Sequence, residues 1–128
     1  MEELAMEQLL LHLIGDYLTQ TDWMARNKMR STWAAVCHSV VYAAPFFLIG
    51  SWQAVLVIWS THLLIDRFGL ARYVVFAKNK LTDPGLRWEE VESTGFSKKI
   101  EAWKAFMLLV IVDNTLHLMI NFAALKWL

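Results

Sequence analysis

The chain has 128 residues, 57% of them hydrophobic and 19% charged, and its 12 basic and 12 acidic side chains leave no formal net charge. This composition excludes a disordered or low-complexity chain and shows no basic footprint for nucleic acid. The single cysteine, Cys37, excludes a disulfide framework and a cysteine-rich zinc site. A chain of this length predicts a single domain, residues 1–128.

Four apolar segments predict four helices, over about 4–18, 32–49, 52–68 and 103–125, with a polar loop over about 72–100. No Lys, Arg, Asp or Glu occurs from Ser31 to Ile65, a run long enough for two membrane-crossing helices of about 17–20 residues each. The first predicted helix is short, so it either crosses at the lower limit of length or lies partly in the interface. We therefore expect an all-α integral membrane bundle of four helices.

Basic residues concentrate in the connections that follow the first and third predicted helices. By the positive-inside rule these connections face the cytoplasm, which predicts a multi-pass protein whose site opens on that side. We expect membrane lipids as partners, allow for a homo-oligomer and expect no nucleic acid. A cationic ring at the mouth of a site suits an anionic headgroup or phosphoester, and we expect such a ring to consist of Arg26, Lys28, Arg30, Arg67 and Arg72. A substrate-binding role is assigned to Arg26, Arg67 and Arg72.

All four histidines lie in the predicted helices, one in each, and three aspartates accompany them. The spacing is four residues in every pair: His12 with Asp16, His62 with Asp66, and Asp113 with His117. Residues four apart share one face of a helix, so each pair directs two ligand-type side chains the same way. The second predicted helix contributes His38 alone. Polar neighbours such as Tyr42 and Asn121 are expected to make interhelical hydrogen bonds or to fix a ligand.

Ionisable groups in a membrane are costly, and a shared cation compensates them. Imidazole and carboxylate together are ligands of zinc, manganese or iron. We therefore predict one or two divalent ions, zinc first and manganese or iron as alternatives, held by His12, Asp16, His38, His62, Asp66, Asp113 and His117. A carboxylate that the metal does not fully engage, Asp66 or Asp113, is the expected catalytic base toward a metal-activated water.

Two other classes of function fit the same sequence. A small ion or metal transporter uses buried Asp and His side chains as a relay. A non-catalytic phage membrane factor, for example one that blocks superinfection by binding a host membrane protein, would depend on the loop at 72–100 and not on Asp66 or His62.

The motifs His12-Leu-Ile-Gly-Asp16, Thr61-His62-Leu-Leu-Ile-Asp66 and Asp113-Asn-Thr-Leu-His117 carry a resemblance over nearly the whole chain. The chain resembles a family of small bacterial and phage integral membrane proteins of unknown function. That resemblance implies the bacterial inner membrane and adds Gln20 and Asp22 as possible site residues. More loosely, the motifs are similar to those of membrane-bound metal-dependent hydrolases, with zinc-dependent phospholipase C-like His and Asp residues. This second resemblance implies hydrolysis of a phosphoester, such as a phospholipid or a lipid-linked phosphate.

Overall fold

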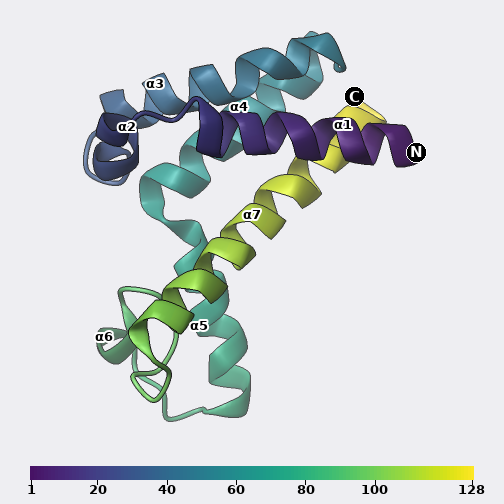
Figure 1. Ribbon diagram of the computed structural model, residues 1–128. Coiled ribbons are helices and arrows are strands. Elements are labelled where there is room, and N and C mark those ends of the chain that lie inside the picture. The colour runs from purple at the N-terminus through teal and green to yellow at the C-terminus, as the bar shows by residue number, and fades with distance from the viewer. The chain divides into compact units, whose positions relative to one another are not determined.

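The computed structural model describes residues 1–128 and contains only helices and their connections (Figure 1). The all-α prediction is therefore confirmed. In chain order the elements are α1 (Glu2–Leu13), the π-helical turn η1 (Ile14–Leu18), α2 (Asp22–Asn27), α3 (Thr32–Ala43), the 3₁₀ turn η2 (Ala44–Leu48), α4 (Trp52–Phe68), α5 (Leu70–Thr82), α6 (Trp88–Val91) and α7 (Ala102–Trp127). The chain forms two compact units: the first comprises Met1–Phe68 and His117–Leu128, and the second comprises Gly69–Leu116.

The prediction of a four-helix integral membrane bundle is wrong. Only α7 is by itself long and apolar enough to cross a membrane, judged by length and composition. The helical stretch Thr32–Leu48 falls short of that length, and its last turn changes to 3₁₀ geometry where Pro45 removes a backbone donor. Helix α4 reaches the required length only together with α5, and the two are broken apart at Gly69, which has a φ of +59°. Within the long uncharged run, therefore, no helix meets the length of a candidate membrane span by itself.

The polar loop predicted over about 72–100 contains helices α5 and α6. Helix α5 buries Ala71 and Val75, four residues apart, while its lysines remain exposed. In the second unit Val75 packs with Phe96 and Ala105. Gly95, with a φ of +80°, lies so close to the α5 backbone at Arg72 that a side chain there would collide with it. The prediction of a polar loop therefore missed an amphipathic helix, because the exposed face of α5 carries charged residues.

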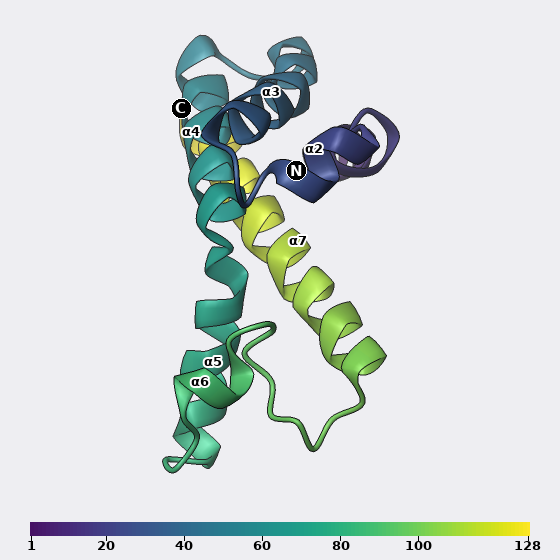
Figure 2. The same cartoon turned by 90° about the vertical axis from the view of Figure 1, so that its left-hand side faces the viewer.

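The first unit is built around the α3–α4 hairpin, whose two helices lie side by side in both views (Figures 1 and 2). Its apolar core includes Tyr42, Phe46 and Ile58, all fully buried. Ser31 caps α3, because its hydroxyl accepts a hydrogen bond from the backbone N–H of Ala34. This packing places the four histidines in the interior of the same unit.

Gly15, within η1, marks the closest approach of the first helical segment to α3. A Cβ atom at this position would collide with the ring of Tyr42, which is fully buried and has no room to withdraw. The sequence therefore needs glycine here for space, not for an unusual backbone angle.

Overpacking costs about 1–3 kcal/mol, and alanine gains roughly 1 kcal/mol over glycine in a helix. Because the Tyr42 ring is fully buried, the cost falls in the upper part of its range, and we expect Gly15→Ala to lower the free energy of unfolding by about 1–2 kcal/mol. The matched control is Gly85→Ala, where the nearest atom to the new methyl group lies at 3.6 Å. Chemical denaturation followed by circular dichroism measures both variants. A Gly15→Ala protein as stable as the parent would contradict the close packing of Gly15 on Tyr42.

Candidate metal site

Six of the seven predicted metal ligands lie together in the first unit. They are His12 on α1, Asp16 on η1, His38 on α3, His62 and Asp66 on α4, and His117 on α7, and every one of them is buried. The seventh, Asp113, stands one turn before His117 on α7 and belongs to the second unit. Elements far apart in the sequence thus bring imidazoles and carboxylates into one interior.

Four atoms of this group converge on one point: Oδ1 of Asp16, Nε2 of His38, Nε2 of His62 and Oδ2 of Asp66. The two imidazole nitrogens lie 3.0 Å apart. His38 Nε2 lies 3.2 Å from the Asp16 oxygen and 3.1 Å from the Asp66 oxygen. His62 Nε2 lies 3.5 Å and 3.3 Å from the same two oxygens. The two carboxylate oxygens lie within 4.8 Å of each other.

The five separations, 3.0–3.5 Å, lie at or slightly below the edge lengths of a metal-centred tetrahedron. Zinc bonds to nitrogen and oxygen of about 2.0–2.2 Å place ideal tetrahedral ligands about 3.3–3.6 Å apart. Asp16 Oδ1 is buried and accepts no hydrogen bond of good geometry, whereas the buried Asp66 Oδ2 has the ammonium of Lys28 2.8 Å away. A buried acceptor without a donor is costly, and a cation at the centre would satisfy Asp16 Oδ1. The buried group can therefore hold a metal ion.

Proton affinities in this group are shifted by opposite influences. Burial raises the pKa of Asp16, but the neighbouring His38 and the charges of His62 and His12 lower it more, so it lies below its ordinary value. Burial lowers the pKa of His38, but contacts with Asp16 and Asp66 raise it more, so it lies above its ordinary value. In the metal-free protein His38 thus readily holds a proton that offsets part of the carboxylate charge.

His117 contacts both α4 residues of this group, His62 and Asp66, through its two ring nitrogens. Its Nε2 lies 3.2 Å from Asp66 Oδ1, and its Nδ1 shares a hydrogen bond of 3.2 Å with Nδ1 of His62. The second nitrogen of His62 and the second oxygen of Asp66 are thereby left to face the other ligands. Such supporting hydrogen bonds fix ring orientation and ligand basicity at metal sites.

A second supporting network centres on the Tyr42 hydroxyl. It lies 2.7 Å from His12 Nδ1 and accepts a 2.7 Å hydrogen bond from the side-chain amide of Asn121. The Tyr42 ring stacks on His62 with ring centroids 3.6 Å apart. Tyr42 and Asn121 follow His38 and His117 by four residues, the same spacing that identifies the ligand pairs. His12 therefore supports the four converging atoms and is not one of them.

Lys28, which follows α2, brings a positive charge to the same point. Its Nζ lies 2.8 Å from Asp66 Oδ2, and its side chain is 22% exposed, whereas those of the two carboxylates are 9% exposed or less. The sequence offered no specific signal for this contact, because Lys28 belongs to a connection in which several basic residues occur. By sequence alone, Lys28 does not differ from the other basic residues of this connection.

The residues predicted to bind substrate have varied positions. The Gln20 side chain donates a 3.0 Å hydrogen bond to the backbone oxygen of Asp16, next to the site. Asp22 and Arg26 form an exposed ion pair with each other. Arg67 donates to the backbone oxygen of Met29 and to the Thr32 hydroxyl, and so holds the segment after α2 on α4. Arg72 lies in the second unit and donates to the Glu92 backbone oxygen.

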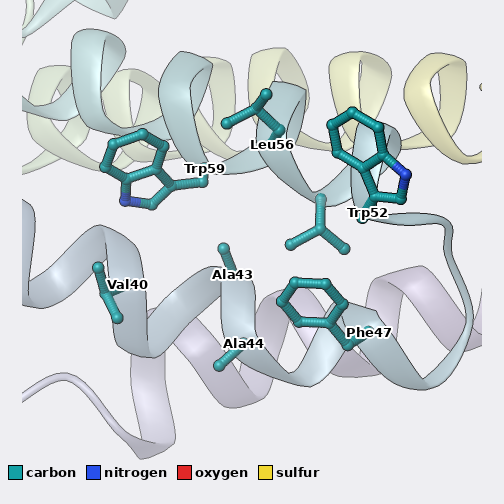
Figure 3. Close-up of a pocket in the computed structure, with 8 residues that line it drawn as sticks. Val40, Ala43, Ala44, Phe47, Trp52, Leu56 and Trp59 are labelled. Atoms are coloured by element: carbon teal, nitrogen blue, oxygen red, sulfur yellow. The ribbon is translucent and has the colours of Figure 1, made fainter.

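A cavity of about 480 Å³ opens elsewhere in the first unit, between the α3–η2 segment and α4 (Figure 3). It is lined by apolar and aromatic side chains, among them Val40, Phe47, Trp52 and Trp59. None of the six clustered site residues lines it. The ionisable chemistry and the apolar cavity are therefore separate features of this unit.

Comparison with known proteins gives one match. Residues 4–127 match the family described as "Protein of unknown function (DUF3307)". No curated protein and no solved structure is significantly similar to the chain. The resemblance to a family of unknown function is thus confirmed, and no relative supports the looser resemblance to metal-dependent hydrolases. The chain belongs to the DUF3307 family.

Proposed function

We propose that this protein binds one divalent metal ion through Asp16, His38, His62 and Asp66, with zinc as the preferred ion. The observation that supports this is the convergence of two imidazole nitrogens and two buried carboxylate oxygens, which lie 3.0–3.5 Å apart along five of their six separations. A tetrahedral set of nitrogen and oxygen ligands suits zinc, whereas manganese favours six oxygen-rich ligands.

The proposed activity is hydrolysis of a phosphoester. A bound zinc ion with an open coordination position lowers the pKa of water and polarises a phosphoryl oxygen. Four protein ligands fill a tetrahedron, so one carboxylate must release the position. Asp16 is suited to this, because its other oxygen lies 3.6 Å from His12 Nδ1 and its backbone lies in a π-helical turn. Such turns occur frequently at functional sites.

Asp66 would accept the proton of the attacking water in this proposal. Asp66 Oδ1 faces His117 Nε2 at 3.2 Å, so a proton taken up by the carboxylate has a neighbouring imidazole to share it. The two roles of Asp66, ligand and base, fall to its two different oxygens.

A lipid-linked phosphate is the proposed substrate class, and a bacterial cytoplasmic membrane the proposed location. Support comes from α7, which is long and apolar enough to span, and from large apolar side chains exposed on the first unit, such as Leu48 and Trp52. Exposed apolar surface of this kind marks interaction with membranes or other proteins.

A structural metal site is the second candidate. Four protein ligands, all buried, are typical of zinc ions that hold a fold together and leave no position for water. In that case the ion stabilises the packing of η1, α3 and α4 without supporting turnover.

We expect the protein, purified without added metal and then titrated with zinc, to bind about one equivalent per chain. His62→Ala should weaken zinc binding by more than about 100-fold, because it removes a ligand, whereas the supporting residue His117 should cost about 10–100-fold when replaced by alanine. Elemental analysis and chelator competition measure these values, with circular dichroism to verify folding. A stoichiometry near zero would refute the metal site.

Zinc affinity should fall as the pH is lowered from 8 to 6. The metal needs neutral His38, whose pKa is raised in the metal-free protein, so at lower pH binding must displace a proton. We expect a loss of roughly tenfold or more over this range, together with proton release on binding. Titration calorimetry in two buffers of different ionisation enthalpy measures both. Affinity that does not change with pH would exclude a histidine among the ligands.

Hydrolysis of a chromogenic phosphodiester and of phospholipid vesicles tests the catalytic proposal. The zinc-loaded protein should be active, the metal-free protein inactive, and Asp66→Asn slower by roughly 10²–10⁴-fold, the usual contribution of a general base. The second candidate gives a different result: zinc raises the melting temperature, but no phosphoester is cleaved.

A further inference from the structure

We propose that Lys28 and the metal ion together form a binding site for an oxyanion such as a phosphoryl group. The inference rests on the proposed metal site and identifies a ligand-binding residue that the chemistry of the four ligands does not supply. Lys28 contacts Asp66, one of the four proposed ligands.

The distances place Lys28 beside the ion. Its Nζ lies 2.8 Å from Asp66 Oδ2, the same oxygen that forms one corner of the tetrahedron. A zinc–oxygen bond of about 2.0–2.2 Å therefore puts the ammonium group no more than about 5 Å from the ion. An oxyanion with two free oxygens can bridge this separation, with one oxygen on the metal and one accepting a hydrogen bond from Lys28.

The charges of the site favour such a ligand. A divalent ion would bring two positive charges to the two carboxylates, Asp16 and Asp66, and the ammonium of Lys28 adds a third beside the same oxygen of Asp66. A site loaded in this way attracts an anion.

The position of Lys28 also suits a binding role. Its side chain is partly exposed, while the ligands are buried, so an incoming anion meets the ammonium group first. The segment that carries it is anchored, since Arg67 donates a 2.6 Å hydrogen bond to the backbone oxygen of Met29. A lysine held in place in this way acts as a fixed point charge for phosphate.

The test measures binding of inorganic phosphate to the full-length, zinc-loaded protein by titration calorimetry, and zinc affinity by chelator competition. We expect Lys28→Met to weaken phosphate binding by roughly tenfold or more, because it removes a hydrogen bond to a charged group. The same variant should bind zinc as tightly as the parent or more tightly, because a like charge near the ion is gone. Lys28→Arg should retain phosphate binding, and Lys99→Met, an exposed lysine of the second unit, controls for net charge.

The possible outcomes separate the role of Lys28 from the metal site. Unchanged phosphate affinity in Lys28→Met, with zinc still bound, overturns the role of Lys28 and leaves the metal site standing. Absence of zinc binding by the parent protein overturns both proposals. The parent protein also provides a test that needs no variant. Phosphate should bind its zinc-loaded form and not its metal-free form. Equal binding to both forms would refute a site made jointly by Lys28 and the metal.

Discussion

Two buried carboxylates facing the same point are the constraint on which the site depends. Asp16 and Asp66 would repel each other in an interior of low dielectric unless positive charge lay between them. The structure brings the ammonium of Lys28 to 2.8 Å from Asp66 Oδ2, and contacts with the two carboxylates raise the pKa of His38. A divalent ion at the centre would supply the charge more completely, since it would also contact Asp16 Oδ1, which accepts no hydrogen bond of good geometry.

The fold forms this arrangement by packing three short helical elements closely together. Each of η1, α3 and α4 contributes at least one of the four converging atoms, so no single element contains the site. Gly15 permits the approach of η1 to Tyr42, and Tyr42 in turn stacks on His62. The same residues therefore pack the helices and orient the site. A substitution at Gly15 would displace Tyr42, and a displaced Tyr42 would in turn affect His62.

Sequence spacing identified the site residues because the i and i+4 relation is a local property of helices. His62 with Asp66 and His12 with Asp16 needed only a helical segment to share a face, and both segments are helical. The membrane bundle failed for the opposite reason. Mean hydropathy measures how apolar a segment is but not how its helix continues: the segment from Thr32 changes to 3₁₀ geometry at Pro45, α4 ends before Gly69, and only α7 meets the length of a candidate span by itself. Lys28 could not be singled out, since its contact with Asp66 depends on how a connection folds back on α4.

Whether a bound ion would take part in catalysis or only stabilise the fold would depend on the mobility of one carboxylate. Asp66 is held at both oxygens, by His117 on one side and by Lys28 on the other. Asp16 has only the more distant His12 at its second oxygen, 3.6 Å away, and it lies in a π-helical turn whose hydrogen bonding differs from that of an α-helix. Of the two carboxylates, Asp16 is therefore the one that can leave the ion at low cost. An anion that binds Lys28 would approach on the side of Asp66, so the held carboxylate marks the entry side and the looser one provides the open position.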